Sequence, residues 1–344
     1  MHSNHHTSQL LARHIGLACL LVSFAGCLLP EFDTPPIDPA LIKDDSPGSG
    51  GGTTACVAGV YQNSVNLTVA GATTTYAGEC TISGKVTINV DFPTYKQLAA
   101  VRRIQGVLVI RGAGAGPAVS PLPNLTDVDQ SVLISATQLG HLPVFPKLST
   151  IKVSLQITGN TKAVSIAGFD ALRQVGALQV SNNAATTWKT FGKLEDVSGA
   201  VGVNNNYNLT SVTFASVGNF FGGLQIDKNA CAEINLPSAH NIDGLFIQAN
   251  TKLASVRAPM LTAMSQFTIN ANQLLSNTSI TLGKLKTLGH FTLKTQPNIT
   301  ALTWLGTQVK MAGDLQVCAS GITADDAAAW LTQQGGQPKL VGCN

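Results

Sequence analysis

The sequence predicts an all-β, right-handed solenoid of about 23-residue repeats, with parallel strands and a short C-terminal capping helix. Three observations predict it. Short segments with two apolar residues two positions apart recur at intervals of 21 to 24 residues. An asparagine follows six consecutive segments at the same distance. Charged residues are only 11% of the chain, whereas about 25% is typical of soluble domains.

The composition also excludes several classes of protein. With 44% hydrophobic residues and few charges, the chain is neither a charged disordered protein nor a charge-rich helical bundle. The net charge of +3 comes from 21 basic and 18 acidic residues, and no block of like charge stands out. Nucleic-acid binding needs clustered Lys and Arg, so no nucleic-acid partner is expected.

Residues 1–26 are predicted to be a signal peptide. The apolar run 15–25 follows Arg13 and is too short to span a bilayer, which needs about 20 apolar residues. It ends in the sequence Phe-Ala-Gly-Cys at 24–27, which resembles the lipobox of bacterial lipoproteins, although Phe24 replaces the usual Leu. The resemblance implies cleavage before Cys27 and lipidation of its thiol. An ordinary signal peptide cut nearby is the alternative, and Cys19 is a weaker competing site.

Residues 27–55 are predicted to be a tether that holds a folded domain away from a membrane. They contain several prolines and the glycine-rich run 48–52, and they show no apolar periodicity. Leu28 follows the expected lipidated cysteine, and in lipoproteins of this kind an Asp there favours the inner membrane. The resemblance therefore implies a bacterial cell envelope protein anchored in the outer membrane, with the side of that membrane left open.

The repeat defines one expected strand per turn, within a first turn and cap at 56–97 and a repeat region at 98–318. In the strand ending at Ser181, Leu178 and Val180 share one face. One such turn cannot bury its apolar residues alone, whereas a stack buries a continuous core. The expected strand ends are Asn89, Arg111, Ser135, Thr158, Ser181, Asn204, Asp227, Gln248, Asn270, Lys294 and Cys318.

An asparagine column is expected two residues after the strand ends. Asn tolerates left-handed turns and its side chain can bond neighbouring backbone, so a bend should follow each strand. A stacked column of Asn can also bond from rung to rung. Its members are Asn160, Asn183, Asn206, Asn229, Asn250 and Asn272.

The segment Val175-x-x-Leu178-x-Val180-x-x-Asn183 resembles the core of a leucine-rich repeat. The chain departs from that repeat in two ways. The next apolar residue stands three positions after the Asn, as Leu209 does after Asn206, and the connecting segments lack a helix-forming pattern. The chain is in this respect more similar to the receptor L domain, over about residues 56–344. That family includes the ligand-binding solenoids of growth-factor-type receptors, with relatives among fungal GPI-anchored cell-wall proteins and bacterial lipoproteins. A right-handed β-helix of the polysaccharide-lyase type is the alternative architecture.

Four cysteines are expected to close the two ends of the solenoid. Cys56 and Cys80 flank the first turn, and Cys318 and Cys343 fit the same position of successive rungs about 4.8 Å apart. The expected disulfides are Cys56–Cys80 and Cys318–Cys343. Residues 319–344 should form the C-terminal cap, with a helix that begins at Thr323. Cys231 falls in an apolar column and is expected to be a buried free thiol, with a reactive or metal-binding Cys as the alternative.

No catalytic residues, metal ligands or cofactor are predicted, and the chain is not expected to be an enzyme. The solenoid histidines His141, His240 and His290 fall at different positions in their repeats, so they should not converge on a metal. His290 and Asp314 share a column, but no Ser or Cys nucleophile stands beside them, so an exposed ion pair is the expectation. Paired carboxylates such as Asp127 and Asp129 are expected to be solvated.

Five Asn-x-Ser/Thr sequences occur. Because the chain also carries a sequence that resembles a bacterial lipobox, we interpret them as recurring parts of the solenoid repeat rather than as glycan sites. They stand at Asn66, Asn124, Asn208, Asn277 and Asn298.

The candidate binding face is formed by residues that alternate with the core positions and should point outward. It is rich in amides and contains one aromatic ring, so it could bind a glycan or a protein ligand. The alternative is a soluble outer face that avoids aggregation without charge. The candidate residues are Gln179, Asn204, Gln225, Asp227, Phe246, Gln248, Asn270 and Lys294.

The function expected from the sequence is that of a non-catalytic cell-envelope lipoprotein whose solenoid binds a glycan or protein ligand. A structural envelope protein without a specific ligand is the first alternative. A β-helix carbohydrate-active enzyme is the second.

Overall fold

The computed structural model describes residues 54–55, 60–61, 64–67, 76–77, 80–89, 98–112, 121–306, 308–334 and 339–342. All of them belong to one compact unit, Ile37–Asn344. The predicted signal peptide, Cys27, the tether up to residue 53, and the cysteines Cys56 and Cys343 lie outside the described residues.

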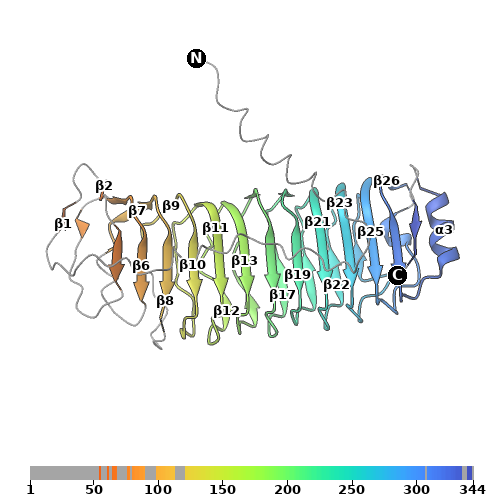
Figure 1. Ribbon diagram of the computed structural model, residues 1–344, viewed down its shortest axis with the longest axis horizontal. Helices are drawn as coiled ribbons and strands as arrows, with labels where there is room; N and C mark the ends of the chain where they lie inside the picture. Colours follow the sequence, from red (N-terminus) through yellow and green to blue (C-terminus); the bar gives the residue numbers. More distant parts are fainter. Residues whose placement is uncertain are drawn as a thin grey trace, which may run out of the picture. The chain divides into compact units, whose positions relative to one another are not determined.

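The unit is a β-solenoid with about 11 turns and a spacing of about 23 residues, as the sequence predicts. Successive turns contribute parallel strands to one continuous sheet (Figure 1). The main column of strands is β3 (Val65–Leu67), β6 (Val86–Asn89), β8 (Leu108–Arg111), β10 (Val132–Ser135), β11 (Thr150–Thr158), β13 (Gln174–Ser181), β16 (Val201–Asn204), β19 (Leu224–Asp227), β21 (Asn241–Gln248), β23 (Ala263–Asn270), β25 (Thr287–Lys294), β27 (Leu315–Cys318) and β28 (Leu340–Val341).

Shorter strands complete the turns. One column precedes the main strands in the same sheet, and the long strands β11, β13, β21, β23 and β25 belong to both columns. Its short members are β2 (Val60–Tyr61), β5 (Cys80–Ile82), β7 (Val101–Ile104), β9 (Asp127–Val128), β15 (Asp196–Val197), β18 (Asn219–Phe220) and β26 (Lys310–Met311). The other small sheets contain β1 (Thr54–Ala55) and β4 (Tyr76–Ala77), β12 (Ser165–Ile166) and β14 (Thr187–Trp188), and β17 (Ser211–Thr213), β20 (Glu233–Asn235), β22 (Ser255–Arg257) and β24 (Ile280–Thr281).

The register of the main column agrees with the repeat read from the sequence. Ser181 pairs with Asn204, Asn204 with Asp227, and Asp227 with Gln248. Each of the eleven expected strand ends is the last residue of its strand. The register is fixed because a slip of one residue would turn the apolar residues away from the core.

The bend after each strand differs from the expectation in one respect. The left-handed residue is the one directly after the strand end, and the asparagine comes one residue later. These left-handed residues are Ala136, Asn182, Asn205, Lys228, Ala249, Ala271, Thr295 and Ala319, with φ between 47° and 56°, together with Gly159. Six of the eight non-glycine residues are Ala, Lys or Thr, which have no local hydrogen bond to favour this conformation. Stacking of the turns therefore imposes the bend.

A second bend is rich in glycine; it comes before the short main strands, and in long ones such as β13 and β25 it lies within the strand. A Cβ on Gly222 would collide with the backbone of Gly199 in the preceding turn, and a Cβ on Gly199 would lie 2.9 Å from the carbonyl oxygen of Gly176. Gly106 and Gly289 make similar backbone contacts with their preceding turns. The turns approach so closely at this bend that a side chain does not fit.

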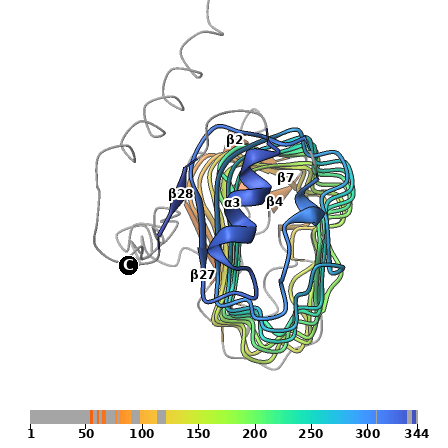
Figure 2. The same ribbon diagram turned by 90° about the vertical axis from the view of Figure 1, so that its right-hand side faces the viewer.

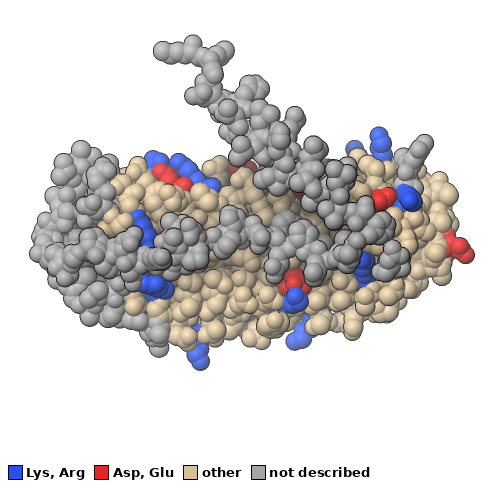
Figure 3. All heavy atoms as spheres, viewed as in Figure 1, with Lys and Arg blue, Asp and Glu red and all other residues tan. Residues whose placement is uncertain are grey.

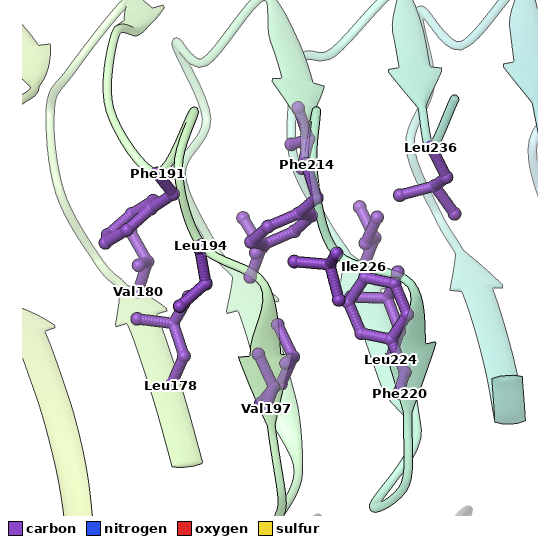
Figure 4. Close-up of a cluster of buried hydrophobic side chains, with 14 of the residues drawn as sticks. Leu178, Val180, Phe191, Leu194, Val197, Phe214, Phe220, Leu224, Ile226 and Leu236 are labelled. Atoms are coloured by element: carbon purple, nitrogen blue, oxygen red, sulfur yellow. The ribbon is translucent and has the colours of Figure 1, made fainter. Parts of the chain in front are cut away.

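The core fills the interior of the stack. Figure 4 shows Leu178, Val180 and Val197 pointing toward Phe191 and Phe214, which come from the opposite wall. All five residues are fully buried. Phe145, Phe169, Phe191 and Phe214 continue along the stack with ring centroids 5.3 to 6.4 Å apart. A continuous core across turns is what a solenoid needs, because no single turn could bury it.

The predicted capping helix is α3 (Ala324–Thr332), which lies across the end of the stack (Figure 2). Thr323 is its N-cap, and the side chain of Asp326 completes a capping box with it. Ala327, Trp330 and Leu331 are buried. A short 3₁₀ helix, η4 (Thr303–Leu305), is the other helical element among the described residues.

Candidate functional site

The asparagine column forms a hydrogen-bonded ladder inside the bends. The Nδ2 of Asn206 donates to Oδ1 of Asn229 at 3.0 Å, and Oδ1 of Asn206 accepts from both the backbone N–H and Nδ2 of Asn183 at 3.1 Å. Nδ2 of Asn206 also donates to the carbonyl oxygen of Val180 at 3.0 Å. Equivalent bonds run from Asn160 to Asn272, and all six side chains are at most 3% exposed. The ladder thus satisfies buried backbone groups of several turns.

Two residues that the sequence analysis did not identify end this ladder. Both the backbone N–H and Oγ1 of Thr137 donate to Oδ1 of Asn160, at 3.1 and 2.8 Å. The amide of Gln296, oriented to satisfy its neighbours, accepts from the backbone N–H of Asn272 at 2.7 Å and donates to its carbonyl oxygen at 2.6 Å. Both residues stand two after a strand end, so the column position identifies them although the residue type changes.

The candidate binding face lies on the outer side of β13 to β25, but it is more closely packed than expected. Gln225 is 9% exposed and Phe246 is 4% exposed. Gln179, Asn204, Asp227, Gln248, Asn270 and Lys294 are half-buried. Alternation correctly assigns these residues to the face opposite the core, but it does not indicate how closely neighbouring side chains pack.

Two glycines explain part of this packing. A Cβ on Gly244 would lie 2.6 Å from Cε2 of Phe246, so the aromatic ring lies against the backbone of its own strand. Gly202 is the only glycine at its position among the described main strands, and the side-chain oxygen of Gln179 fills the space that a Cβ there would take. Asn204 borders the same space, with Nδ2 3.1 Å from the Cβ position.

The polar groups of the face are incompletely paired. Oδ1 of Asn204 is inaccessible to solvent and has no hydrogen-bond partner. Burial raises the pKa of Asp227, while Lys228, whose Nζ lies 3.2 Å from its carboxylate, opposes the shift. Asn270 donates to Oε1 of Gln248 at 3.4 Å. Beside Gly202, the face therefore presents one acceptor, the side-chain oxygen of Gln179, and one donor, Nδ2 of Asn204.

No arrangement of catalytic groups emerges among the described residues. His141, His240 and His290 are exposed on separate turns. The expected ion pair of His290 with Asp314 is not among the described contacts; instead, Nδ1 of His290 accepts the backbone N–H of Asp314 at 3.1 Å. Within the described part of the chain, no group of three His, Cys, Asp or Glu side chains could hold a metal ion.

The paired carboxylates have structural contacts rather than free solvation. Asp129 binds Arg103 of the preceding turn at 2.6 Å and Lys152 of the following turn at 2.9 Å. Burial would raise the pKa of Asp129, but hydrogen bonds from Lys152 and Arg103 outweigh it and hold this pKa below its usual value. These charges join three turns. On the face shown in Figure 3, acidic and basic side chains are otherwise scattered.

The cysteines are only partly described. Cys231 is a fully buried free thiol, as expected. Desolvation raises the pKa of its thiol to about 12, and Sγ lies 3.7 Å from Oδ1 of Asn250. Cys80 and Cys318 are not free thiols. Because Cys56 and Cys343 lie outside the described residues, the two pairings stay predictions.

The Asn-x-Thr phrases have a structural use in the stack. The side chain of Asn124 donates to the carbonyl oxygen of Ala99 at 2.8 Å, and that of Asn298 donates to Gln273 at 2.7 Å. Thr126, two residues after Asn124, donates to the carbonyl oxygen of Arg102. Such bonds between turns account for the recurrence of the phrase.

Comparison with known proteins gives one distant similarity. No protein-family model matches the chain, and no solved structure matches it. Among the described residues, no helix has the length and apolar character that crossing a membrane requires. A cell surface GPI-anchored protein of the fungus Arthroderma benhamiae is 28% identical over 144 residues, which are 42% of this chain. The chain matches about a third (35%) of the length of that relative. The chain is therefore similar, over part of its length, to a fungal cell-surface protein.

Proposed function

We propose that the protein is a non-catalytic cell-envelope protein whose solenoid recognises a glycan or a protein ligand through the outer face of the main strands. The observation that carries this proposal is the column of polar side chains held in register on that face, from Gln179 to Lys294. A rigid hydrogen-bonded sheet orients these side chains before a ligand arrives, so binding would order few groups.

We propose that the protein is located in the bacterial outer membrane, with a lipid on Cys27 and residues 27–55 as the tether. The sequence at 24–27 supports the anchor, and the similarity to a fungal cell-surface protein supports a surface location. Intact mass of the protein from native membranes tests this part. A mass that begins at Cys27 with added acyl chains is expected, whereas a mass without lipid contradicts the anchor.

Substitutions on the face test the recognition function. Gln225→Ala and Gln248→Ala should each weaken binding of a ligand found on envelope polysaccharide or protein arrays by about tenfold, with folding checked by urea unfolding. Asn208→Ala is the matched control, because Asn208 is exposed and lies in a bend away from this face. Unchanged affinity in both face variants would contradict the proposed function.

A purely structural role in the envelope is the second candidate. The close packing of Gln225 and Phe246 favours it, because an already buried face has less area to offer a ligand. A deletion strain separates the two roles. If the deletion strain loses envelope integrity and expression of the double variant Gln225→Ala/Gln248→Ala restores it fully, the role is structural, since that variant lacks the binding residues.

We also infer the disulfides Cys56–Cys80 and Cys318–Cys343 as closures of the two ends. The pairing of Leu315 with Leu340 and of Gln316 with Val341 has the register that the second disulfide requires. Alkylation of the unfolded protein without reduction should label Cys231 but neither expected pair. Labelling of Cys80 or Cys318 would refute the corresponding bridge.

A further inference from the structure

Apolar side chains lie on the outer side of the main sheet as well as in the core. Val107, Val109 and Leu133 form an apolar cluster separate from the core, and each is at most 5% exposed. Leu133 is in register with Val109 on the neighbouring strand. Phe246 has the same position in its strand, five strands further along, and is 4% exposed. The outer side therefore has two apolar sites with polar side chains between them.

The shielding of these side chains from solvent distinguishes this face from another one. In the small sheet β17, β20, β22 and β24, the outward residues Thr213 and Asn235 are half-buried and Arg257 is exposed. Neighbours within a sheet thus leave each other partly accessible in this molecule. The burial of Leu133 and Phe246 therefore indicates a further layer on the main sheet. Apart from the edge strand β28, Figure 2 shows no described element on the outer side of that wall.

The N-terminal segment 28–46, which lies outside the described residues, has the right spacing of apolar residues to form this layer. It has two apolar groups, Leu28, Leu29 and Phe32, and Ile37, Leu41 and Ile42. Its prolines favour polyproline II, in which the nine residues from Phe32 to Leu41 span about 28 Å. The five strand steps from Leu133 to Phe246 span about 24 Å. The two apolar groups are therefore about as far apart as the two apolar sites.

The direction of the segment agrees with the place where it joins the solenoid. Strand β1 (Thr54–Ala55) lies at the N-terminal end, on the side of β8 and β10 rather than of β21 (Figure 1). Residues 43–53 can bridge up to about 36 Å. Leu41 can therefore reach the site at Leu133, and Phe32 comes later on the way to Phe246.

Charge and hydrogen bonding also favour this segment. Residues 28–46 contain five acidic residues and one basic residue, a net charge of −4. The described strand ends of the face include Arg111 and Lys294, and the one carboxylate among them, Asp227, is paired with Lys228. A proline-rich chain has more carbonyl acceptors than N–H donors, so the amide side chains between the two apolar sites can donate to it.

We propose that residues 28–46 pack along the outer side of the main sheet of their own chain. Leu41 lies against Leu133, and Phe32 lies against Phe246. This inference goes beyond the recognition function, because it assigns an occupant to the face when no ligand is bound. A ligand then has to displace the segment, and its release lengthens the tether between the membrane and the solenoid.

Photo-cross-linking in the full chain tests the contact. With p-benzoylphenylalanine in place of Phe246, irradiation should join this position to residues 28–36 of the same chain, as identified by peptide mass. The same amino acid in place of Asn235, on the outer side of β20, is the matched control and should not label that segment. Absence of cross-links from position 246 to residues 28–36 overturns the proposal, and so does a covalent dimer formed through residues 28–36 of a second chain.

Trypsin measures release of the segment, because Lys43 is the only Lys or Arg in residues 28–53. Leu133→Asp places a negative charge beside the acidic segment and should speed cleavage after Lys43 by about tenfold. Thr213→Asp adds the same charge on the outer side of β17 and should change the rate by less than about twofold. Urea unfolding checks that both variants fold.

Equal cleavage rates in the two folded variants overturn the proposal. If Leu133→Asp does not fold, the cross-linking result alone decides. Failure of the proposal leaves the recognition function standing, because ligand affinity of the Gln225→Ala and Gln248→Ala proteins is measured independently.

Discussion

The asparagine bend and the glycine bend hold the turns together by different means. After the strand, a left-handed residue leads into a buried asparagine whose amide bonds to the next turn. At the other bend, glycines let one backbone lie directly against another. The first bend depends on the presence of a side chain and the second on its absence. A solenoid can therefore fix the spacing of its turns by hydrogen bonds on one edge and by close contact on the other.

The largest expected effect is at the hydrogen-bonded bend. Asn206→Ala would leave the backbone N–H of Asn183 without a partner. It would also remove the bonds that Nδ2 of Asn206 donates to the carbonyl oxygens of Val180 and Asn204 and to Oδ1 of Asn229. A buried orphan costs about 1–3 kcal/mol and each lost bond about 0.5–1.5 kcal/mol, so we expect unfolding in urea to show a loss of about 4 kcal/mol. Asn208→Ala is the control; its exposed side chain makes one bond of 3.4 Å, and we expect a loss below about 0.5 kcal/mol. Equal losses would show that the ladder does not stabilise the bend.

The glycine bend should be the next most sensitive. In Gly222→Ala, the new Cβ would collide with the backbone of Gly199, and the preceding turn would have to shift. We expect a loss of about 2–3 kcal/mol in the same urea experiment. Gly192→Ala is the matched control, because no atom lies within 4 Å of the added Cβ. A small change at Gly222 would mean that the spacing of the turns at this bend can relax.

The left-handed position offers a smaller and opposite effect. Ala271 has φ 53°, a conformation that costs an L-residue about 1–2 kcal/mol and glycine almost nothing. Ala271→Gly should therefore stabilise the protein by about 0.5–1 kcal/mol, after the extra freedom of glycine in the unfolded chain is subtracted. Gly159→Ala should destabilise by a similar amount, since its Cβ would have room but its φ is 67°. Thermal unfolding of the two variants should shift Tm in opposite directions.

The two bends also differ in how well the sequence predicts them. The apolar spacing located every strand end, because a residue such as Val180 must face the core in each turn. The asparagine ladder was equally visible, because one residue type repeats in one column. Thr137 and Gln296 were missed, since they end the column with other residue types. The glycine bend was missed because a residue without a side chain leaves no hydropathy pattern, and glycine is common elsewhere in the chain.

The candidate face shows the other limit of sequence analysis. Alternation assigned Phe246 to the outer side, and Phe246 is absent from the apolar core that contains its neighbours Leu245 and Ile247. Gly244 lets the ring lie against the backbone of its own strand, and this contact involves three-dimensional packing rather than periodicity. The partnerless Oδ1 of Asn204 is likewise visible only when every hydrogen bond around it is known.

The smallest expected effect uses Cys231 to compare the opening of the two bends. The buried thiol lies beside Asn250 of the ladder, and desolvation raises its pKa to about 12. At pH 8 the folded protein should therefore alkylate extremely slowly with iodoacetamide, as followed by peptide mass, and the protein unfolded in urea should alkylate at once. Because the folded pKa exceeds the unfolded one, this thiol contributes stability that is full below about pH 9 and falls as pH rises toward 12.

The rates in the two bend variants then separate local from global opening. Asn206→Ala weakens the column of bends that contains Cys231. Alkylation of Cys231 should therefore accelerate by more than the loss of global stability in this variant predicts. Gly222→Ala weakens the bend on the other side of the strand, so its acceleration should match its global loss. Equal acceleration per unit of lost stability in both variants would mean that each turn opens as a whole and that the two bends act as one unit.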